Sequence, residues 1–250
     1  MPSTIFKTVY YPELPESDGQ LEIRGHLYNR RSYLAAKRIV DIFISSMLIV
    51  LFFPVLFPLI ALVIKLSSKG PVFFRQKRVG FLGKIFWCYK FRTMYVNDLA
   101  DSKQAVKDDP RITPVGQFLR NTCLDEIPQF INVFLGHMSI VGPRPHMLKD
   151  SNAFSSVVAN YKFRHMAKPG ITGISQVRGY RGPATSFQSI FRRYQWDAFY
   201  VRNMGFRLDI RIMTETAVLM LRSIFYRDKP VPLESHVIHG QAKNVAKKIA

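Results

Sequence analysis

The sequence predicts a helix-rich α+β fold with one apolar membrane helix near its N-terminus, a small β-hairpin and amphipathic helices at the membrane interface. Residues 42–64 hold no charged side chain, and as a helix they extend about 34 Å, enough to cross a bilayer. Only residues 71–92 contain two neighbouring strand-like runs, whereas the longer segments after them have the apolar spacing of helices. Aromatic residues and arginines share the last two helical segments, as in helices of the lipid headgroup layer.

The composition excludes several classes of protein. With 48% hydrophobic and 21% charged residues, the 250-residue chain is not disordered. Its 36 Lys and Arg against 17 Asp and Glu give a net charge of +19, nearly all of it after residue 66. This charge calls for an anionic neighbour, such as nucleic acid, a phospholipid surface or phosphorylated substrates. Cys88 and Cys123 are too few for a disulfide framework, the histidines lack zinc-ligand spacing, and no P-loop or Rossmann glycine motif occurs.

Residues 37–66 form the predicted membrane segment. Pro54 and Pro58 lie in its middle, where each removes a backbone donor and tends to kink a helix. Basic residues flank the segment on both sides, so the positive-inside rule keeps both ends in the cytoplasm. A helix broken near Pro54 would enter one leaflet and return, but spanning helices also tolerate prolines. The residues alone therefore leave a re-entrant and a spanning helix equally open.

The rest of the chain is predicted to be one mixed domain. Strands over 71–76 and 85–92 are joined by a glycine-containing turn over residues 80–84. Helical patterns cover 115–121, 125–135, 152–166, 185–202 and 206–226, and loops are expected at 142–145, 168–173 and 179–183. The expected organisation is an N-terminal extension (1–36), the membrane segment (37–66), the main domain (67–228) and a C-terminal tail (229–250).

The helices predicted over 185–202 and 206–226 combine Phe, Tyr and Trp with several arginines. Such helices suit the headgroup layer of a membrane. A core helix with a basic solvent face has a similar composition in soluble proteins. The membrane segment elsewhere in the chain favours seating at the interface.

Asp125 and Glu126 are the strongest candidates for a reactive site. Adjacent carboxylates repel each other unless a cation or a helix N-terminus compensates. Thr122 stands three residues before Asp125, the spacing of a capping box, which would place both acids in a first helical turn. One carboxylate could then attack phosphorus while the other holds a divalent cation such as Mg²⁺. A capped helix start with solvated acids explains the same spacing.

Basic side chains supply candidate phosphate contacts. Lys90 and Arg92 alternate with aromatic residues on the second strand, so both point to one face. Arg144 lies between two prolines, which hold it on a stiff backbone. The further candidates are Arg120, Lys168, Arg178 and Arg181. The alternative for Arg144 is a loop arginine that is exposed to water, and the alternative for Lys90 and Arg92 is the solvated side of a hairpin.

These residues belong to an ordered series of short motifs between about Lys37 and Arg227. The series is Lys90-Phe-Arg-Thr-Met94, Asp109-Pro-Arg-Ile-Thr113, Leu124-Asp-Glu-Ile-Pro-Gln129, Asn132-Val133, Met138-Ser139, Gly142-Pro-Arg-Pro145 and Lys168-Pro-Gly-Ile-Thr-Gly173. In order and spacing it resembles the bacterial sugar transferases, which are monotopic polyprenyl-phosphate phosphoglycosyl transferases. The resemblance implies a re-entrant membrane helix and a catalytic domain over 67–228 on the cytoplasmic face of the bacterial inner membrane.

The resemblance also implies an activity and its partners. The family transfers a sugar-1-phosphate from a UDP-sugar to polyprenyl (undecaprenyl) phosphate and releases UMP, which begins exopolysaccharide, capsule, O-antigen or glycoprotein glycan assembly. Asp125 matches the nucleophile that forms a covalent phosphosugar intermediate, and Glu126 matches the acid that holds Mg²⁺ beside it. The expected partners are the UDP-sugar, the polyprenyl phosphate and anionic inner-leaflet lipids. Nucleic acid is not expected, and a homo-oligomer is left open.

The family pattern assigns further residues. Arg120 and Arg144 match positions expected to bind phosphate or the carrier headgroup, with Lys90 and Arg92 as further phosphate contacts. The expected nucleotide contacts are Lys168, Gly170, Thr172 and Arg178, whereas Asp197 and Asp209 match recurrent acids without an assigned role.

The chain departs from the family pattern at two places. Phe53 precedes Pro54 where many relatives have serine, and His137 replaces an acid, which leaves the role of that position open. The Gly179-Tyr-Arg-Gly182 motif is similar to that of the hexose-1-phosphate branch, which makes UDP-glucose or UDP-galactose the expected donor.

Two rival hypotheses remain from the sequence. The first is a membrane-anchored protein that binds nucleic acid or anionic lipid through its basic domain. The second is an inactive scaffold of a polysaccharide assembly complex. The intact Asp125-Glu126 pair argues against a scaffold.

Overall fold

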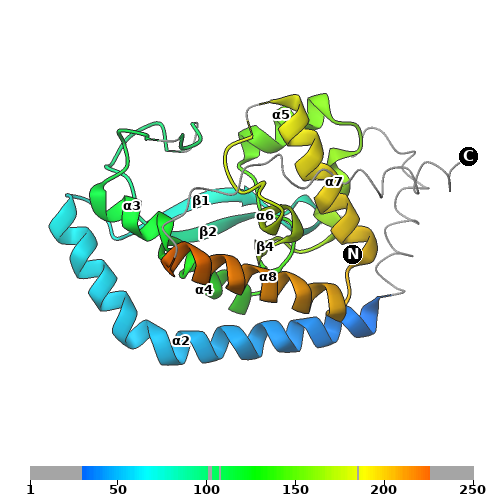
Figure 1. Cartoon of the computed structure of the whole chain (residues 1–250), viewed down its shortest axis with the longest axis horizontal. Helices are drawn as coiled ribbons and strands as arrows, with labels where there is room; N and C mark the ends of the chain where they lie inside the picture. The colour runs from blue at the N-terminus through cyan, green and yellow to red at the C-terminus, as the bar shows by residue number, and fades with distance from the viewer. Residues whose placement is uncertain (1–29, 101–102, 107, 185, 226–250) are drawn as a thin grey trace, which may run out of the picture.

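The computed structural model describes residues 30–225 except 101–102, 107 and 185. The tail predicted over 229–250 and most of the N-terminal extension lie outside the described residues. Figure 1 shows the helix α2 along one edge of the molecule, two small sheets in the middle, and the helices α5 and α7 beyond them. The protein is helix-rich with little sheet, as the sequence predicts.

Helix α2 (Arg31–Ser67) contains the whole predicted membrane segment. It is assigned as one helix through Pro54 and Pro58, and it bends in Figure 1, for which prolines are the usual cause. By length and composition it is able to cross a membrane: its most apolar window has a mean hydropathy of 3.0 and is only 11% buried. A helix with so little burial is not the core helix of a soluble domain.

Both ends of α2 pack against the same domain. Near its start, Arg38 donates hydrogen bonds to the carbonyl oxygens of Val133 (2.6 Å) and Phe134 (2.7 Å), and the Asp41 carboxylate accepts one from the Ile140 amide (3.0 Å). Near its end, Ile60 and Ile64 join a buried cluster that contains Phe91 and Leu119. The middle of the helix carries exposed apolar side chains such as Val50 and Val55.

The predicted hairpin is confirmed as β1 (Phe73–Val79) and β2 (Ile85–Phe91), which pair antiparallel with Gln76 opposite Cys88. A 3₁₀ turn, Phe81–Gly83, joins them. Side chains two residues apart on one strand point to the same face of the ribbon. Phe86 and Cys88 therefore pack on Val133 and Met138 from one face.

A second, parallel pair of strands was not predicted. The strand β4 (Gly170–Thr172) falls in the loop predicted over 168–173, and β3 (Ser139–Val141) lies just before the loop predicted over 142–145. Three-residue strands are too short to show the two-residue periodicity, and glycine and proline beside them favour turns. Gly142 and Gly170 allow the close approach, because a Cβ on Gly170 would lie 2.1 Å from the Gly142 amide nitrogen.

Two predicted helices are wrong in their extent. The segment predicted over 125–135 is a 3₁₀ turn, Leu124–Glu126, followed by α4 (Gln129–Phe134), because Pro128 cannot donate to a continuing helix. The helix predicted over 152–166 is α5 (Leu148–Val157) followed by a 3₁₀ segment, Tyr161–Met166. Asn160 between them has a φ of 56°, which no right-handed helix accommodates.

Three further helices match the predictions closely: α3 (Pro114–Asn121), α7 (Phe187–Asn203) and α8 (Phe206–Phe225). The short α6 (Ile174–Val177) was not predicted. Tyr200 and Val201 of α7 pack with Ile212 of α8 in the main buried cluster. Other faces expose Phe187, Phe199 and Ile210. Their seating at a membrane interface stays a prediction.

Candidate active site

The local backbone places Asp125 and Glu126 on a tight turn. The Thr113 hydroxyl caps α3 by accepting a hydrogen bond from the Gly116 amide (2.8 Å). After α3 the chain reverses at Cys123, whose φ is 59°, and enters the 3₁₀ turn. The expected capping by Thr122 is wrong, because its hydroxyl instead donates to the carbonyl oxygen of Phe118 (2.9 Å). Both carboxylates are buried, rather than solvated at a helix start.

Three cations from distant parts of the chain converge on Glu126. Its Oε1 is 2.8 Å from Lys90 Nζ of β2 and 2.7 Å from Arg144 Nη2 of the loop after β3. Its Oε2 is 3.2 Å from Arg181 Nη2 of the loop after α6. Burial raises the pKa of Glu126, but Arg144, Lys90 and Arg181 outweigh burial, and the pKa lies well below its usual range.

Asp125 has different surroundings. Its carboxylate makes no hydrogen bond within the described part of the chain, and Lys90 Nζ lies 3.9 Å away. Burial raises the pKa of Asp125 above its usual value, Lys90 opposes this rise, and the charge of Glu126 adds to it. Paired acids whose pKa values are pushed apart are typical of sites where the two groups have separate roles.

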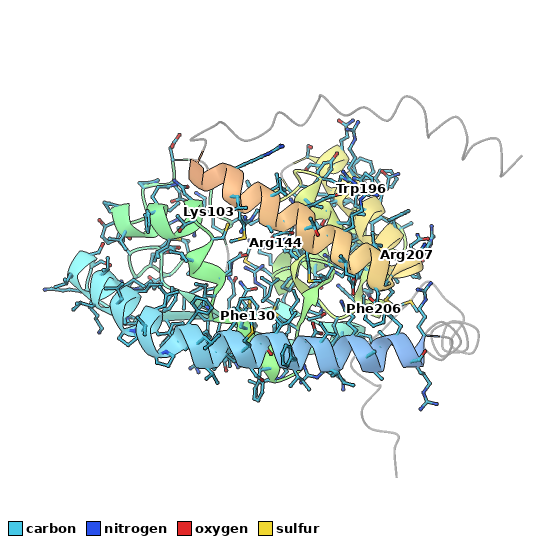
Figure 2. All side chains as sticks on the ribbon, turned by 60° about the horizontal axis from the view of Figure 1, so that its bottom comes forward. Lys103, Phe130, Arg144, Trp196, Phe206 and Arg207 are labelled. Carbon is cyan, nitrogen blue, oxygen red and sulfur yellow. The ribbon has the colours of Figure 1, made fainter. Side chains whose placement is uncertain are left out.

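The two acids line a cavity of about 650 Å³, a volume typical of ligand sites. It brings together all six residues that the sequence assigns to catalysis and phosphate binding: Lys90, Arg92, Arg120, Asp125, Glu126 and Arg144. Arg120 donates from Nε to the Thr93 hydroxyl (2.8 Å). Arg92 donates to the carbonyl oxygens of Ser68 (2.9 Å) and Lys69 (2.7 Å), so it also holds the end of α2 against the cavity. In Figure 2 Arg144 lies toward the middle of the molecule, whereas Trp196 and Arg207 lie at its edge.

The four expected nucleotide contacts lie elsewhere. None of Lys168, Gly170, Thr172 and Arg178 is among the described residues that line the cavity. Thr172 Oγ1 is hydrogen-bonded to Thr216 Oγ1 of α8 (2.6 Å). Arg178 lies over the Trp196 ring (5.5 Å) and 3.7 Å from Glu215. In this structure Thr172 and Arg178 support the packing of β4 and the residues after it against α8.

The two acids without an assigned role hold elements together. Asp197 of α7 accepts from Nε (3.0 Å) and Nη2 (2.7 Å) of Arg164, and both side chains are fully buried. Asp209 of α8 accepts from the hydroxyls of Tyr33 (2.7 Å) and Tyr200 (2.8 Å) and pairs with Lys37 of α2. Neither acid lines the cavity.

Several cavity residues were missed by the sequence reasoning. They are Gln76, Arg78, Gln104, His146, Asp150 and Arg193. Only His146 had a signal, since it directly follows the Pro143-Arg144-Pro145 motif. Of the others, Gln76, Arg78 and Asp150 come together because α5 packs beside β1, and no spacing in the chain encodes that contact.

Comparison with known proteins identifies the family. The sequence profile of the bacterial sugar transferases matches residues 32–223, which include the cavity and α2. The chain belongs to the bacterial sugar transferase family. This membership confirms the resemblance that the ordered motifs indicate.

Several members of this family are similar in sequence to most of this chain. A UDP-glucose:undecaprenyl-phosphate glucose-1-phosphate transferase of Klebsiella pneumoniae is 45% identical over 178 residues, which cover 71% of this chain and 38% of the relative. The exopolysaccharide production protein PSS of Rhizobium leguminosarum bv. phaseoli is 43% identical over 74% of this chain and 94% of its own length. An undecaprenyl-phosphate galactose phosphotransferase of Salmonella typhimurium is 37% identical over 81% of this chain and 44% of its own. The chain thus spans less than half of the Klebsiella and Salmonella relatives.

Proposed function

We propose that this chain transfers a sugar-1-phosphate from a UDP-sugar to undecaprenyl phosphate and releases UMP. The observation that carries the proposal is the pair of buried acids with opposite surroundings in one cationic cavity. Glu126 is held by three cations, whereas the Asp125 carboxylate makes no hydrogen bond within the described residues. The relatives whose names state this reaction align over the same part of the chain.

Asp125 is the nucleophile of the proposed mechanism. One of its carboxylate oxygens attacks the phosphorus that carries the sugar, and the bond from that phosphorus to the oxygen bridging the two phosphates breaks. UMP leaves with the bridging oxygen, and the phosphosugar remains on Asp125. A phosphate oxygen of undecaprenyl phosphate then attacks the same phosphorus and displaces the carboxylate. The product is a sugar on undecaprenyl diphosphate.

The cations around Glu126 stabilise the charge that moves during both steps. Lys90 and Arg144 face Glu126 and line the cavity beside Asp125, and Arg120 lines it as well. Arginine forks and lysine ammonium groups suit phosphate oxygens. Because the cavity is partly closed from water, fixed charges act more strongly there than at the surface.

The donor set fits Mg²⁺. This ion is usually held by one or two carboxylates together with substrate phosphates. Asp125 and Glu126 are adjacent hard oxygen ligands. The Asp125 oxygens make no hydrogen bond in the described structure, whereas Glu126 would have to release one of its three cations to bind the ion. The described residues contain no cluster of three or more acids, histidines and cysteines, so the diphosphate of the donor would complete the ligand set. When bound, Mg²⁺ would neutralise charge on that diphosphate.

The end of the cavity beside α2 is where the lipid carrier would present its phosphate. Arg92 ties Ser68 and Lys69, just beyond the end of α2, to this end of the cavity. Pro71, Phe73 and Val96 give it an apolar lining. An apolar approach from a membrane helix toward cations suits an acceptor with a phosphate head and an isoprenoid chain.

Membrane attachment through a re-entrant α2 belongs to the same proposal. Both ends of this helix pack on one domain, which supports placing both ends on one side of the membrane with the exposed apolar middle in the lipid. A net charge of +19 suits the anionic cytoplasmic face of the inner membrane. Exopolysaccharide assembly is one process that would begin with the proposed reaction, and one relative is named for exopolysaccharide production.

The proposed function is tested by UMP release from the detergent-solubilised full chain with Mg²⁺, undecaprenyl phosphate and a panel of UDP-sugars. We expect one donor to release UMP and the Asp125→Asn variant to release none. The matched control is Asp98→Asn, because Asp98 is exposed and does not line the cavity. Loss of activity on chelation and its return with added Mg²⁺ would support the metal assignment. Full activity of Asp125→Asn would contradict the mechanism.

A second measurement tests the covalent step. Mixing the parent with its donor and no acceptor should add the mass of one hexose phosphate to the intact protein, because the second step cannot occur. Asp125→Asn should show no added mass. UMP release without any adduct in the parent would favour direct transfer between the two substrates.

A further inference from the structure

The cavity extends beyond the two acids, away from α2. This further part, here called the polar end, is lined by Gln76, Gln104, His146, Asp150 and Arg193. Unlike the end beside α2, it carries amide, carboxylate and imidazole groups. The proposed function gives none of them a task.

The polar end is assembled from four segments of the chain. Asp150 lies in the first turn of α5, and its carboxylate accepts a hydrogen bond from Gln104 Nε2 (2.6 Å). Gln76 of β1 donates from Nε2 to the Ala100 carbonyl oxygen (2.9 Å). Arg193 of α7 donates from Nη2 to the Gly182 carbonyl oxygen (2.6 Å). These contacts fix several polar groups around one space.

Two buried polar atoms at this end lack a partner among the described residues: His146 Nε2 and Arg193 Nε. His146 is 4% exposed and Arg193 is 7% exposed. Buried donors and acceptors in native proteins nearly always have partners, and a polar ligand or an ordered water at this end would supply them. The other ring nitrogen of His146 is hydrogen-bonded to the Tyr161 hydroxyl (2.6 Å). Burial lowers the pKa of His146 well below its usual value, which keeps one donor and one acceptor nitrogen on its ring.

Arg78 connects the polar end to the catalytic acids. It lines the same cavity, donates to Pro145 O (3.0 Å) and binds the Gln76 side chain. Arg144, the residue before Pro145, pairs with Glu126 (2.7 Å), so Arg78 contacts the chain one residue away from a partner of the catalytic acids. The group that occupies the polar end is therefore close to the phosphorus attacked by Asp125.

The hexose is attached directly to that phosphorus, whereas the uracil is separated from it by a second phosphate and a ribose. Among the described residues of the polar end, the aromatic ring that lines the cavity is that of Phe154, which is only 6% exposed and packs edge-on against His146 (5.4 Å) and Tyr161 (5.8 Å), so it offers little surface to a base. By contrast, Tyr95 lines the cavity elsewhere and is 48% exposed, so an accessible aromatic ring lies outside the polar end.

We infer that the polar end binds the hexose of the donor, with the Asp150 carboxylate accepting hydrogen bonds from sugar hydroxyls and Gln104 turning from Asp150 toward the sugar. The inference rests on the proposed function and adds to it the residues that select the sugar. Hexoses that differ at one hydroxyl then differ in their contacts with Asp150. A site built to bind a hydroxyl discriminates strongly against a sugar that does not present it.

The test compares the affinities of UDP-hexoses and UMP by isothermal titration on the detergent-solubilised full chain, with Asp125→Asn present in every variant because the parent would react with the donor. The ligands are UDP-glucose, UDP-galactose, their N-acetylamino forms and UMP, which lacks the hexose. Asp150→Asn should raise the dissociation constant of the preferred UDP-hexose about 10- to 100-fold, since a hydrogen bond to a charged group is lost. The dissociation constant of UMP should not change, and the differences in affinity between the UDP-hexoses should become smaller. Asp98→Asn is the matched control and should behave like the parent.

A second variant guards against misfolding. Gln104→Ala removes the second side chain that is proposed to contact the sugar, and Gln104 is only half-buried, so the variant should fold. It should weaken UDP-hexose binding and leave UMP binding unchanged, as Asp150→Asn does. Equal weakening of UMP and UDP-hexoses by Asp150→Asn would place the nucleotide at the polar end and overturn the inference. Unchanged binding of every ligand would overturn it as well. UMP release is measured in parallel, so a parent that binds UDP-hexoses without turnover would contradict only the proposed function.

Discussion

Asp125 and Glu126 are consecutive residues with opposite electrostatic surroundings. Glu126 holds Lys90, Arg144 and Arg181 in place, so it organises the cations. Asp125 keeps its oxygens free of hydrogen bonds in the described structure, at the cost of a raised pKa. A carboxylate with weakly held lone pairs is a better nucleophile than one clamped by cations. The division of roles between the two acids therefore follows from the residues around them.

The raised pKa of Asp125 predicts the acid limb of the pH profile. The nucleophile acts only when deprotonated, so UMP release should fall as pH is lowered through the pKa of Asp125. That midpoint should lie above the value of about 3.9 of an unperturbed aspartate. Lys90→Met removes the nearest cation and should move the midpoint to higher pH. Lys84→Met, at an exposed position of the hairpin turn, is the control. Initial rates over a pH series measure both, and a Lys90→Met limb at lower pH would contradict the assignment.

Asp197 is predicted to act on stability. Its partner Arg164 is 1% exposed, and removing one member of a buried pair leaves an uncompensated charge. Asp197→Asn should lower the free energy of unfolding by about 3–5 kcal/mol. Asp98→Asn should change it by less than about 0.5 kcal/mol. Urea unfolding in detergent compares the two, and equal midpoints would show that the pair contributes nothing net.

The sequence predicted the chemistry of the site better than its outline. Four site residues belong to short motifs that can be recognised from the sequence alone: Lys90, Asp125, Glu126 and Arg144. The structure brings them together in one cavity. Asp150 stands in no such motif. It reaches the cavity because α5 packs against β1, and linear spacing does not encode that contact. Thr172 shows the reverse, since it stands in a motif yet bonds to Thr216.

At the scale of elements, the parallel strands β3 and β4 set the position of the Arg144 loop. A Cβ on Gly142 would lie 2.1 Å from the Lys168 carbonyl oxygen, and one on Gly173 would lie 2.2 Å from the Gly142 carbonyl oxygen. Real Cβ atoms do not approach backbone so closely. The glycines at 142 and 173 therefore allow the backbone just before Arg144 to contact the backbone of the 168–173 motif.

Substituting one of these glycines should test that role. Gly170→Ala should push β4 away from β3, lower the thermal midpoint and reduce UMP release by displacing Arg144, because its Cβ would meet Gly142 N at 2.1 Å. Gly182→Ala is the matched control for stability, since a Cβ there meets nothing within 4 Å. Thermal unfolding measures the difference. Equal midpoints for the two variants would mean that the strands have room to separate without cost.

Helices were easier to predict than short strands for a physical reason. Helices α7 and α8 run for 17 and 20 residues, so their apolar spacing repeats several times. In contrast, β3 and β4 have three residues each and depend on contacts between distant segments. The break at Asn160 was missed because a single residue with positive φ leaves the surrounding apolar pattern unchanged.

At the scale of the whole molecule, α2 is fastened to one domain at both of its ends. Lys37 pairs with Asp209 of α8, and Phe57 packs against Phe91 of β2 with ring centroids 4.9 Å apart. A spanning helix with this length would have to release one of these ends to place it on the far side of the bilayer. Breaking a buried charged pair or exposing an apolar cluster opposes such a release. The fold therefore favours two ends on one side.

Labelling of single cysteines from each side of the membrane tests this arrangement. Ser32→Cys and Lys69→Cys place thiols at exposed positions beside the two ends of α2, and Val55→Cys places one in its apolar middle, where the native side chain is 73% exposed. The background replaces Cys88 and Cys123 and must still release UMP. In intact spheroplasts an impermeant maleimide should label none of them. In inverted vesicles it should label both ends but not position 55, which the lipid shields. Labelling of one end in spheroplasts would establish a spanning helix, and the contacts of that end with the domain would then have to break in the membrane.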